Sequence, residues 1–92
     1  MSSENSDLGD LTNSVAVTNI DLNAIVQNGL IRYSYADAAN ISNAPTADAT
    51  VVYTRRYAGW VQQYAITQSA KLFIRATWDN NGQYSWSNWA EK

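Results

Sequence analysis

The feature that most constrains the fold is a run of three closely spaced segments in which apolar and polar residues alternate. They cover residues 50–57, 60–67 and 71–78. A period of two places successive side chains on opposite faces of a β-strand. The reversals between the segments, Ala58-Gly59 and Gln68-Ser69-Ala70, are so short that they join antiparallel neighbours. The sequence therefore predicts an antiparallel β-meander at the centre of the fold.

Two further strands are predicted beside this meander, over residues 30–35 and 84–89. The second follows a hairpin loop and reads Tyr-Ser-Trp-Ser-Asn-Trp. On a strand, Trp86 and Trp89 would point to opposite faces, so at most one indole could belong to a single core layer. In the strand over 71–78, one face carries only apolar side chains and is expected to be buried. These side chains are Leu72, Ile74, Ala76 and Trp78.

A short helical turn is predicted before the first of these strands. Asp21 is expected to be its N-cap, and Asn28-Gly29 its end. Residues 36–49 are small and polar and contain the single proline, Pro45, which predicts a long surface loop. The predicted fold is thus all-β: a small antiparallel meander or sandwich of about five strands with a short helical turn, over residues 21–92.

Residues 1–20 are expected to form an extended N-terminal arm, because their polar start cannot bury enough apolar surface to order itself alone. The arm would be flexible or docked to a larger assembly. Its apolar residues are the candidates for that attachment: Leu11, Val15, Val17 and Ile20. An alternative for residues 15–20 is an ordinary edge strand of the same domain.

The missing residue types remove most catalytic chemistry. With no cysteine and no histidine, the chain has no thiolate nucleophile, no Ser-His-Asp triad and no Cys/His metal site. Its acidic residues are scattered, with no recognisable acid and nucleophile pair. We therefore expect a protein that is not an enzyme and that needs no cofactor and no metal.

The charge pattern argues against nucleic acid as the partner. The first 21 residues hold four acidic and no basic residues, a charge of −4, and the remainder holds six basic and four acidic residues, a charge of +2. The pair Arg55-Arg56 is too short to form the basic stripe of a nucleic-acid interface. No hydrophobic run approaches the roughly 20 residues of a membrane span. We expect no nucleic-acid partner and no membrane insertion.

Over residues 20–89, the sequence resembles the knob-type domain found in tail fibres of bacteriophages, prophages and R-type pyocins. The sharpest matching element is Trp86-Ser87-Asn88-Trp89 near the end. The other matching elements, in order, are Asp21-Leu22-Asn23, Gly29, Tyr33, Asn43-Ala44-Pro45, Val51 to Arg56, Val61-Gln62-Gln63-Tyr64 and Leu72-Phe73-Ile74-Arg75.

The resemblance implies a virion protein: a small β-rich knob on a trimeric fibre that binds host-surface glycans or spaces the parts that do. Family members are usually modules within long fibre chains, whereas this sequence has one module and a polar arm. A module docked to other virion proteins through residues 1–20 is therefore expected. The alternatives are a capsid or tail decoration protein with no specific glycan ligand, and a bacterial carbohydrate-binding module or adhesin.

Two clusters are candidate glycan sites, because an indole can stack on a sugar ring while amides, carboxylates and guanidinium groups bind its hydroxyls. The first surrounds the last hairpin and comprises Trp78, Asp79, Asn80, Asn81 and Tyr84. The second lies near the opposite reversal of the predicted sheet and comprises Arg55, Arg56, Tyr57 and Trp60. Its arginines could bind an anionic sugar or a phosphate through paired hydrogen bonds. The alternative for the first cluster is that Trp78 and Trp86 fill the core.

Overall fold

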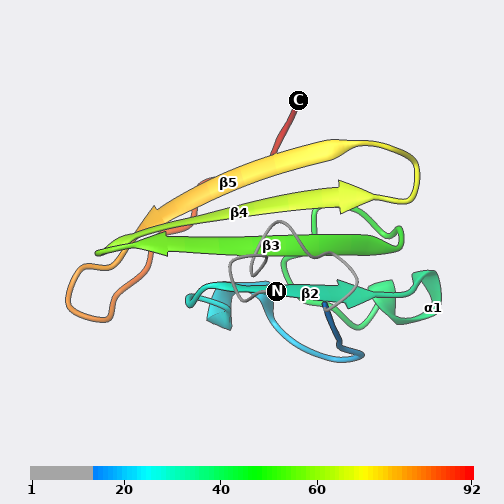
Figure 1. The fold of residues 1–92 in the computed structure, drawn as a ribbon, viewed down its shortest axis with the longest axis horizontal. Coiled ribbons are helices and arrows are strands. Elements are labelled where there is room, and N and C mark those ends of the chain that lie inside the picture. Colours follow the sequence, from blue (N-terminus) through cyan, green and yellow to red (C-terminus); the bar gives the residue numbers. More distant parts are fainter. Residues whose placement is uncertain (1–13) are drawn as a thin grey trace, which may run out of the picture.

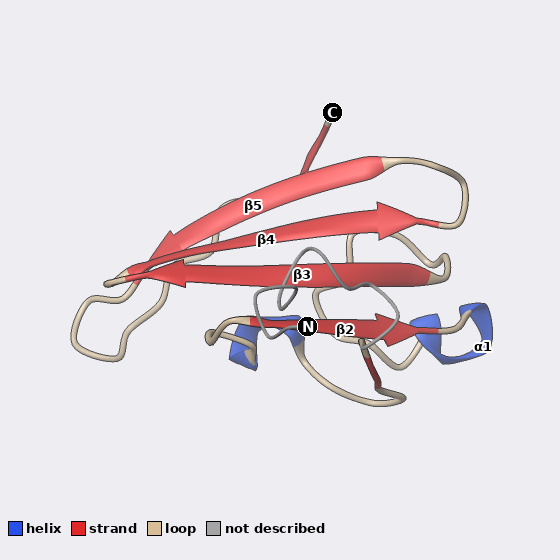
Figure 2. Ribbon diagram, viewed as in Figure 1, coloured by secondary structure: helices blue, strands red, loops and turns tan. Residues whose placement is uncertain are grey.

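The computed structural model describes residues 14–92, which form a single six-stranded sheet (Figures 1 and 2). The strands lie in chain order across the sheet, from β1 at one edge to β6 at the other. In chain order, the elements are β1 (Val15–Ala16), η4 (Leu22–Ala24), β2 (Gly29–Tyr33), α1 (Tyr35–Ala38), β3 (Thr50–Tyr57), β4 (Trp60–Thr67), β5 (Leu72–Trp78) and β6 (Ala90–Glu91).

The central meander predicted from the sequence is confirmed. Strands β2 to β6 pair with their chain neighbours in antiparallel fashion, and only β1 pairs in parallel, with β2. Strands β3 and β4 have the predicted bounds, and β5 begins one residue late. The reversals are as tight as expected: Ala58 and Ala70 adopt left-handed φ angles of 54° and 66°. The fold is all-β, with little helix.

The prediction of a strand over residues 84–89 is wrong. The segment runs beside β5, but side chains supply most of its bonds: the Ser85 amide donates to Thr77 Oγ1 (2.8 Å), and Ser87 Oγ accepts from the Ala76 amide (3.1 Å). One backbone bond, from the Ser87 amide to the Ala76 carbonyl (2.8 Å), is present. Because serine and threonine hydroxyls replace ladder partners, the backbone need not keep the period of two. Regular pairing resumes only at β6.

The helical turn forms at the predicted place but is shorter. Asp21 caps η4 by accepting from the Asn23 amide (2.9 Å), and the turn ends at Ala24, well before Gly29, which begins β2. A second turn, α1, lies where a strand end and a loop were predicted. Ser34 caps it by accepting from the Asp37 amide (3.3 Å), and this N-cap stops β2 at Tyr33.

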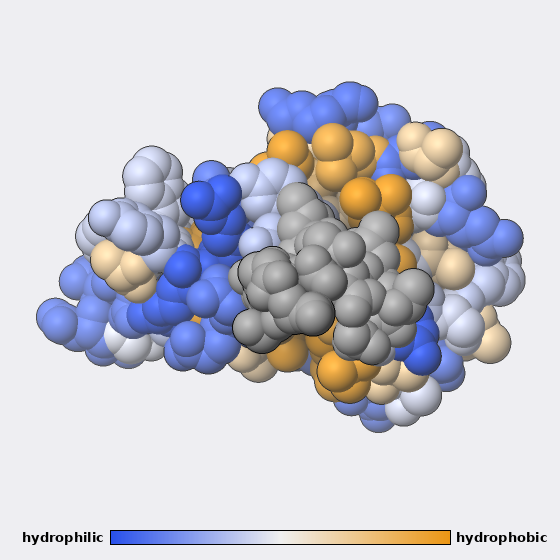
Figure 3. Space-filling model, viewed as in Figure 1, coloured by the Kyte–Doolittle hydropathy of each residue, from blue (hydrophilic) through white to orange (hydrophobic). Residues whose placement is uncertain are grey.

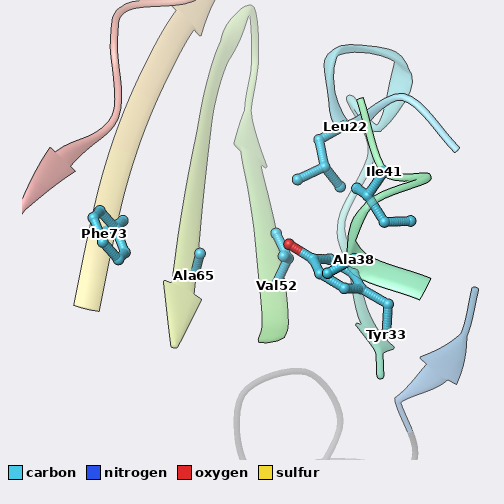
Figure 4. Close-up of a cluster of buried hydrophobic side chains, with 7 residues drawn as sticks. All are labelled: Leu22, Tyr33, Ala38, Ile41, Val52, Ala65 and Phe73. Atoms are coloured by element: carbon cyan, nitrogen blue, oxygen red, sulfur yellow. The ribbon is translucent and has the colours of Figure 1, made fainter. Parts of the chain in front are cut away.

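The hydrophobic core lies between one face of the sheet and a layer of irregular segments (Figure 4). Val52, Ala65 and Phe73 occupy one register row across β3, β4 and β5. Leu22 of η4 and Ile41 of the loop after α1 cover them. The remaining residues of this buried cluster are Tyr33 and Ala38, with Val17, Ile20, Ile25, Ile31, Ala44 and Trp89 packed around them.

The expected burial of the apolar face of β5 is wrong, because the opposite face packs into the core. Phe73, Arg75 and Thr77 are buried, whereas Trp78 is 59% exposed. Leu72, Ile74 and Ala76 are only partly buried. The layer of irregular segments supplies hydrogen-bond partners to the face with Phe73, Arg75 and Thr77. The polar side chains of that face can therefore be buried. The other face of the sheet, called the open face below, carries hydrophobic side chains over its central strands (Figure 3).

Candidate functional site

The strand register brings the two predicted clusters together at one end of the sheet. Trp60 lies opposite Tyr57 on one side and opposite Trp78 on the other. The expectation that the clusters occupy opposite reversals is therefore wrong. The tight β3–β4 turn even contacts the last hairpin, since the Asp79 amide donates to the Gly59 carbonyl (2.7 Å).

Three aromatic side chains on the open face form an exposed group, called the aromatic patch: Tyr57, Trp60 and Trp78. They are 75%, 53% and 59% exposed, respectively. The two indole rings lie 6.4 Å apart between centroids, with their planes inclined by 60°. The alternative in which Trp78 fills the core is excluded by its exposure. A pair of tilted exposed indoles offers an apolar surface on which a sugar ring can stack.

Polar side chains border the aromatic patch on the same face. Arg55 and Gln62 face each other across β3 and β4, and with Tyr57 and Trp60 they line a cavity of about 210 Å³. Arg55 is exposed and takes part in no salt bridge with the described residues. Its guanidinium is available to a ligand at the edge of the patch.

Arg56 has a structural role instead, on the opposite face of β3. Its Nη2 lies 2.6 Å from Asp79 Oδ2, and its Nη1 donates to Tyr84 Oη (3.0 Å) and to the Val26 carbonyl (3.2 Å). Asp79 also accepts from the Gly82 amide (2.6 Å), and this bond, followed by the one from Arg56, lowers the pKa of the carboxyl. These contacts tie the last hairpin to β3. The last hairpin is thus held in place by Arg56, Asp79 and Tyr84.

Asn80 and Asn81 lie at the exposed tip of that hairpin. Asn80 forms a two-bond bridge with Gln83, at 3.0 Å in each direction, and Asn81 has a left-handed φ of 56°. Asparagine adopts that conformation at less cost than most residues. The backbone of the tip is therefore explained by the turn, while both side chains remain exposed.

A second polar group, which the sequence did not reveal, lies under the sheet. Thr54, Gln63 and Arg75 form one register row on the buried face. Gln63 is fully buried and donates to the carbonyls of Leu22 (2.9 Å) and Ile25 (3.1 Å). Because it is fully buried, Gln63 cannot contact another chain.

Arg75 is the centre of this group, and we call its surroundings the arginine pocket. The side chain is only 5% exposed; Nε donates to Gln63 Oε1 (2.9 Å) and Nη1 to Asn23 Oδ1 (2.7 Å). Its guanidinium carbon lies 4.1 Å from the centre of the Trp86 ring and 4.6 Å from that of Trp89. Burial lowers the pKa of Arg75 to about 10, so the group stays charged at neutral pH.

Both indoles of the C-terminal segment are thus on one side of the sheet. Trp86 Nε1 donates to the Asn23 carbonyl (3.3 Å) and Trp89 Nε1 to the Asn43 carbonyl (2.8 Å). The prediction that they point to opposite faces is wrong because the segment is irregular. The nearest signal in the sequence is the arginine in the middle of β5, which lies between Phe73 and Thr77 on the buried face of that strand.

The candidate attachment residues have different positions. Val15 is 62% exposed in β1, which pairs with β2 of the same chain. Val17 and Ile20 pack against the core cluster. The edge-strand alternative for this segment is therefore the one observed for β1. Leu11 lies outside the described residues.

Residues 14–92 contain no group of three or more acidic side chains arranged to hold a metal ion. Within the same range, no helix has the length and apolar character needed to cross a membrane.

The fold has known counterparts among solved structures. The chain superposes on part of the R1 pyocin fiber of P. aeruginosa, solved as C-terminal residues 323–701, with a TM-score of 0.78 and 20% identity; the match covers 100% of this chain and 24% of that one. An N-truncated R2-type pyocin tail fiber matches with a TM-score of 0.74 and 18% identity over 87% of this chain and 32% of that one. The chain thus spans about a quarter to a third of these fiber chains.

No family model matches the sequence, and no curated protein matches it. The structural likeness, at this identity, establishes the fold: that of a domain in R-type pyocin fibers. The fold expected from the resemblance is confirmed.

Proposed function

We propose that this domain, which shares its fold with part of R-type pyocin fibers, is a non-enzymatic module of a tail fibre on a bacteriophage, prophage or pyocin-like particle. The support is the likeness of the fold over the whole domain, at TM-scores of 0.74 and 0.78. The location that follows is the virion or an equivalent particle. Other fibre or tail proteins are then its partners.

We further propose that the module adheres to host-surface glycans. One observation carries this: Trp60 and Trp78, about half exposed, lie side by side with rings 6.4 Å apart. Large exposed apolar groups mark interaction sites. Arg55 at the edge of the patch, and the amides of Asn80 and Asn81 at the hairpin tip, supply hydrogen-bond donors for hydroxyl or acidic groups of a sugar.

Adhesion is tested with the isolated chain on a glycan array and on candidate host cells. Trp60→Ala and Trp78→Ala are expected to lower binding by about tenfold or more, since a stacked aromatic ring contributes on the order of 1.5 kcal/mol beyond its area. Tyr35→Ala is the matched control, because Tyr35 is 71% exposed on α1 and lies outside the patch. Equal binding by the wild type and both tryptophan variants contradicts the proposal.

The central part of the open face favours contacts between chains. A cavity of about 340 Å³ there has mostly apolar walls, and Ile66 in its wall is 47% exposed. Its lining residues are Leu30, Val51, Tyr53, Arg55, Tyr64, Ile66 and Leu72. We propose a homotrimer that buries this area, as fibre architecture requires several chains around one axis.

Sedimentation velocity tests the trimer: a species of three times 10.2 kDa is expected, and Ile66→Glu should convert it to the monomer. A monomer at all concentrations contradicts the trimer. Co-purification with particles, without glycan or cell binding, would instead support a decoration protein.

A further inference from the structure

Arg75 is a buried cation that has no acidic partner in the described part of the chain. Its side chain is 5% exposed, and the one salt bridge found within residues 14–92 joins Arg56 and Asp79. The carboxylate of Asp21 acts on Arg75 only at longer range; it accepts hydrogen bonds from Asn43 Nδ2 (2.7 Å) and the Asn23 amide (2.9 Å). Burying a charge is costly unless the charge is paired.

The guanidinium also has unused donors. Of its five N–H groups, one on Nε and one on Nη1 are bound, by Gln63 and Asn23. Nη2, with two donors, is buried and has no hydrogen-bond partner in residues 14–92. The indoles of Trp86 and Trp89 stabilise the charge through their π faces, but a π face leaves the in-plane N–H groups without an acceptor.

A cavity adjoins this arginine. It measures about 310 Å³, at the lower end of the range for small-molecule sites, roughly 300–1,000 Å³. Its walls combine the two indoles with amide groups. Arg75 and Asn88 are both part of the wall, and the Asn88 side chain is exposed, with no hydrogen bond to the described residues. The full lining is Asn23, Asn43, Ala44, Arg75, Tyr84, Trp86, Ser87, Asn88 and Trp89.

We propose that the arginine pocket binds the carboxylate of an acidic monosaccharide. A planar carboxylate can accept two parallel hydrogen bonds from a guanidinium, and it supplies the missing charge. The tryptophan rings in the wall suit the apolar face of a pyranose, and the Asn88 amide suits its hydroxyls. The cavity is large enough for one sugar unit.

This site is distinct from the aromatic patch. Arg75 is on the buried face of β5, whereas Trp60 and Trp78 are on the open face. The two binding proposals are therefore tested separately. Loss of glycan binding in the Trp60 and Trp78 variants tests the aromatic patch, and the following measurement tests the arginine pocket.

The test is NMR titration of the full chain with glucuronate and, as the matched neutral sugar, glucose. With glucuronate, the indole N–H signals of Trp86 and Trp89 and the Nε–H signal of Arg75 are expected to shift saturably. Glucose is expected to shift none of them. The proposal is overturned if glucuronate causes no shifts or if glucose causes equal shifts. Either result would mean that bound water, and not a carboxylate, accepts the hydrogen bonds of Nη2.

One variant locates the site without disturbing the core. Asn88→Asp adds a negative charge to the cavity wall and is expected to weaken glucuronate binding about fivefold, the effect of one exposed like charge. Asn40→Asp makes the same change at an exposed position outside the cavity and should leave the affinity unchanged. Equal affinity of the Asn88→Asp variant and the wild type would overturn this location for the ligand.

Discussion

The guanidinium carbon of Arg75 lies 4.1 Å from the centre of the Trp86 ring, and this contact joins the C-terminal segment to the buried face of β5. The segment has few regular ladder bonds, so its position depends on side chains. Trp86 also donates to the Asn23 carbonyl, which links it to η4. The contact thus holds together three parts of the chain that are far apart in sequence.

We expect Trp86→Ala to destabilise the domain by about 2–3 kcal/mol, because it removes a packed aromatic side chain and a cation–π contact with a buried arginine. The free energy of unfolding from urea denaturation measures this. Trp78→Ala is the matched control and should change stability by less than about 0.5 kcal/mol, since Trp78 is largely exposed. Equal losses of unfolding free energy for Trp86→Ala and Trp78→Ala would contradict the structural role assigned to Trp86.

The central strands could be predicted from the sequence because each depends on local patterns. Alternation over β3 and β4, with very short turns between them, determines pairing and register together. The Asp21 cap is likewise a local signal. No such pattern determines which face of β5 is buried, because that depends on whether distant groups, such as the Gln63 and Asn23 side chains, can satisfy Arg75.

The same reason explains the outcome for the candidate sites. Trp60 and Trp78 are neighbours because β4 and β5 pair in the observed register. Arg55 and Arg56 are adjacent in sequence and separate in function, since one is exposed and the other holds the last hairpin. The pocket around Arg75 requires an irregular path over residues 84–89, which the alternation of Tyr, Ser and Trp does not indicate.

The second prediction concerns acid stability. The pKa of Asp79 is lower in the folded state than its ordinary value of 3.8, chiefly through the Gly82 amide and then through Arg56. Its contribution to stability is therefore fully present above about pH 4 and is lost as pH falls through the lowered folded pKa. Asp79→Asn should make the fall in unfolding free energy below pH 4 shallower, measured by urea denaturation at a series of pH values.

The pKa values of Asp21 and Asp48 are lowered as well, so part of the acid sensitivity should remain in this variant. Glu91→Gln removes one carboxyl from the exposed strand β6 and serves as the control for net charge. An unchanged pH profile for Asp79→Asn would contradict the role assigned to the Arg56–Asp79 pair.

The third prediction concerns the β4–β5 turn, where Ala70 has a φ of 66°. A left-handed conformation costs an L-residue with a Cβ atom roughly 1–2 kcal/mol, which glycine avoids at some cost in unfolded-state entropy. Ala70→Gly is expected to stabilise the domain by about 0.5–1 kcal/mol, seen as a rise in Tm. Ala39→Gly is the contrasting variant, because Ala39 has an ordinary φ of −67° and should lose stability. A lower Tm for Ala70→Gly would refute the strain argument.

The last prediction separates the contribution of Arg55 to adhesion from that of the tryptophans. Arg55 is exposed at the edge of the aromatic patch, so an attraction to acidic or phosphorylated groups on the host surface would be screened by salt. Arg55→Gln should weaken binding to cells and also flatten its dependence on salt between about 0.05 and 0.5 M, a range over which the Debye length falls several-fold. Trp78→Ala should weaken binding and leave the relative salt dependence as in the wild type, because stacking on a sugar ring involves no net charge. Wild-type binding that does not change with salt would rule out the ionic contribution of Arg55 and leave the two indoles as the basis of adhesion.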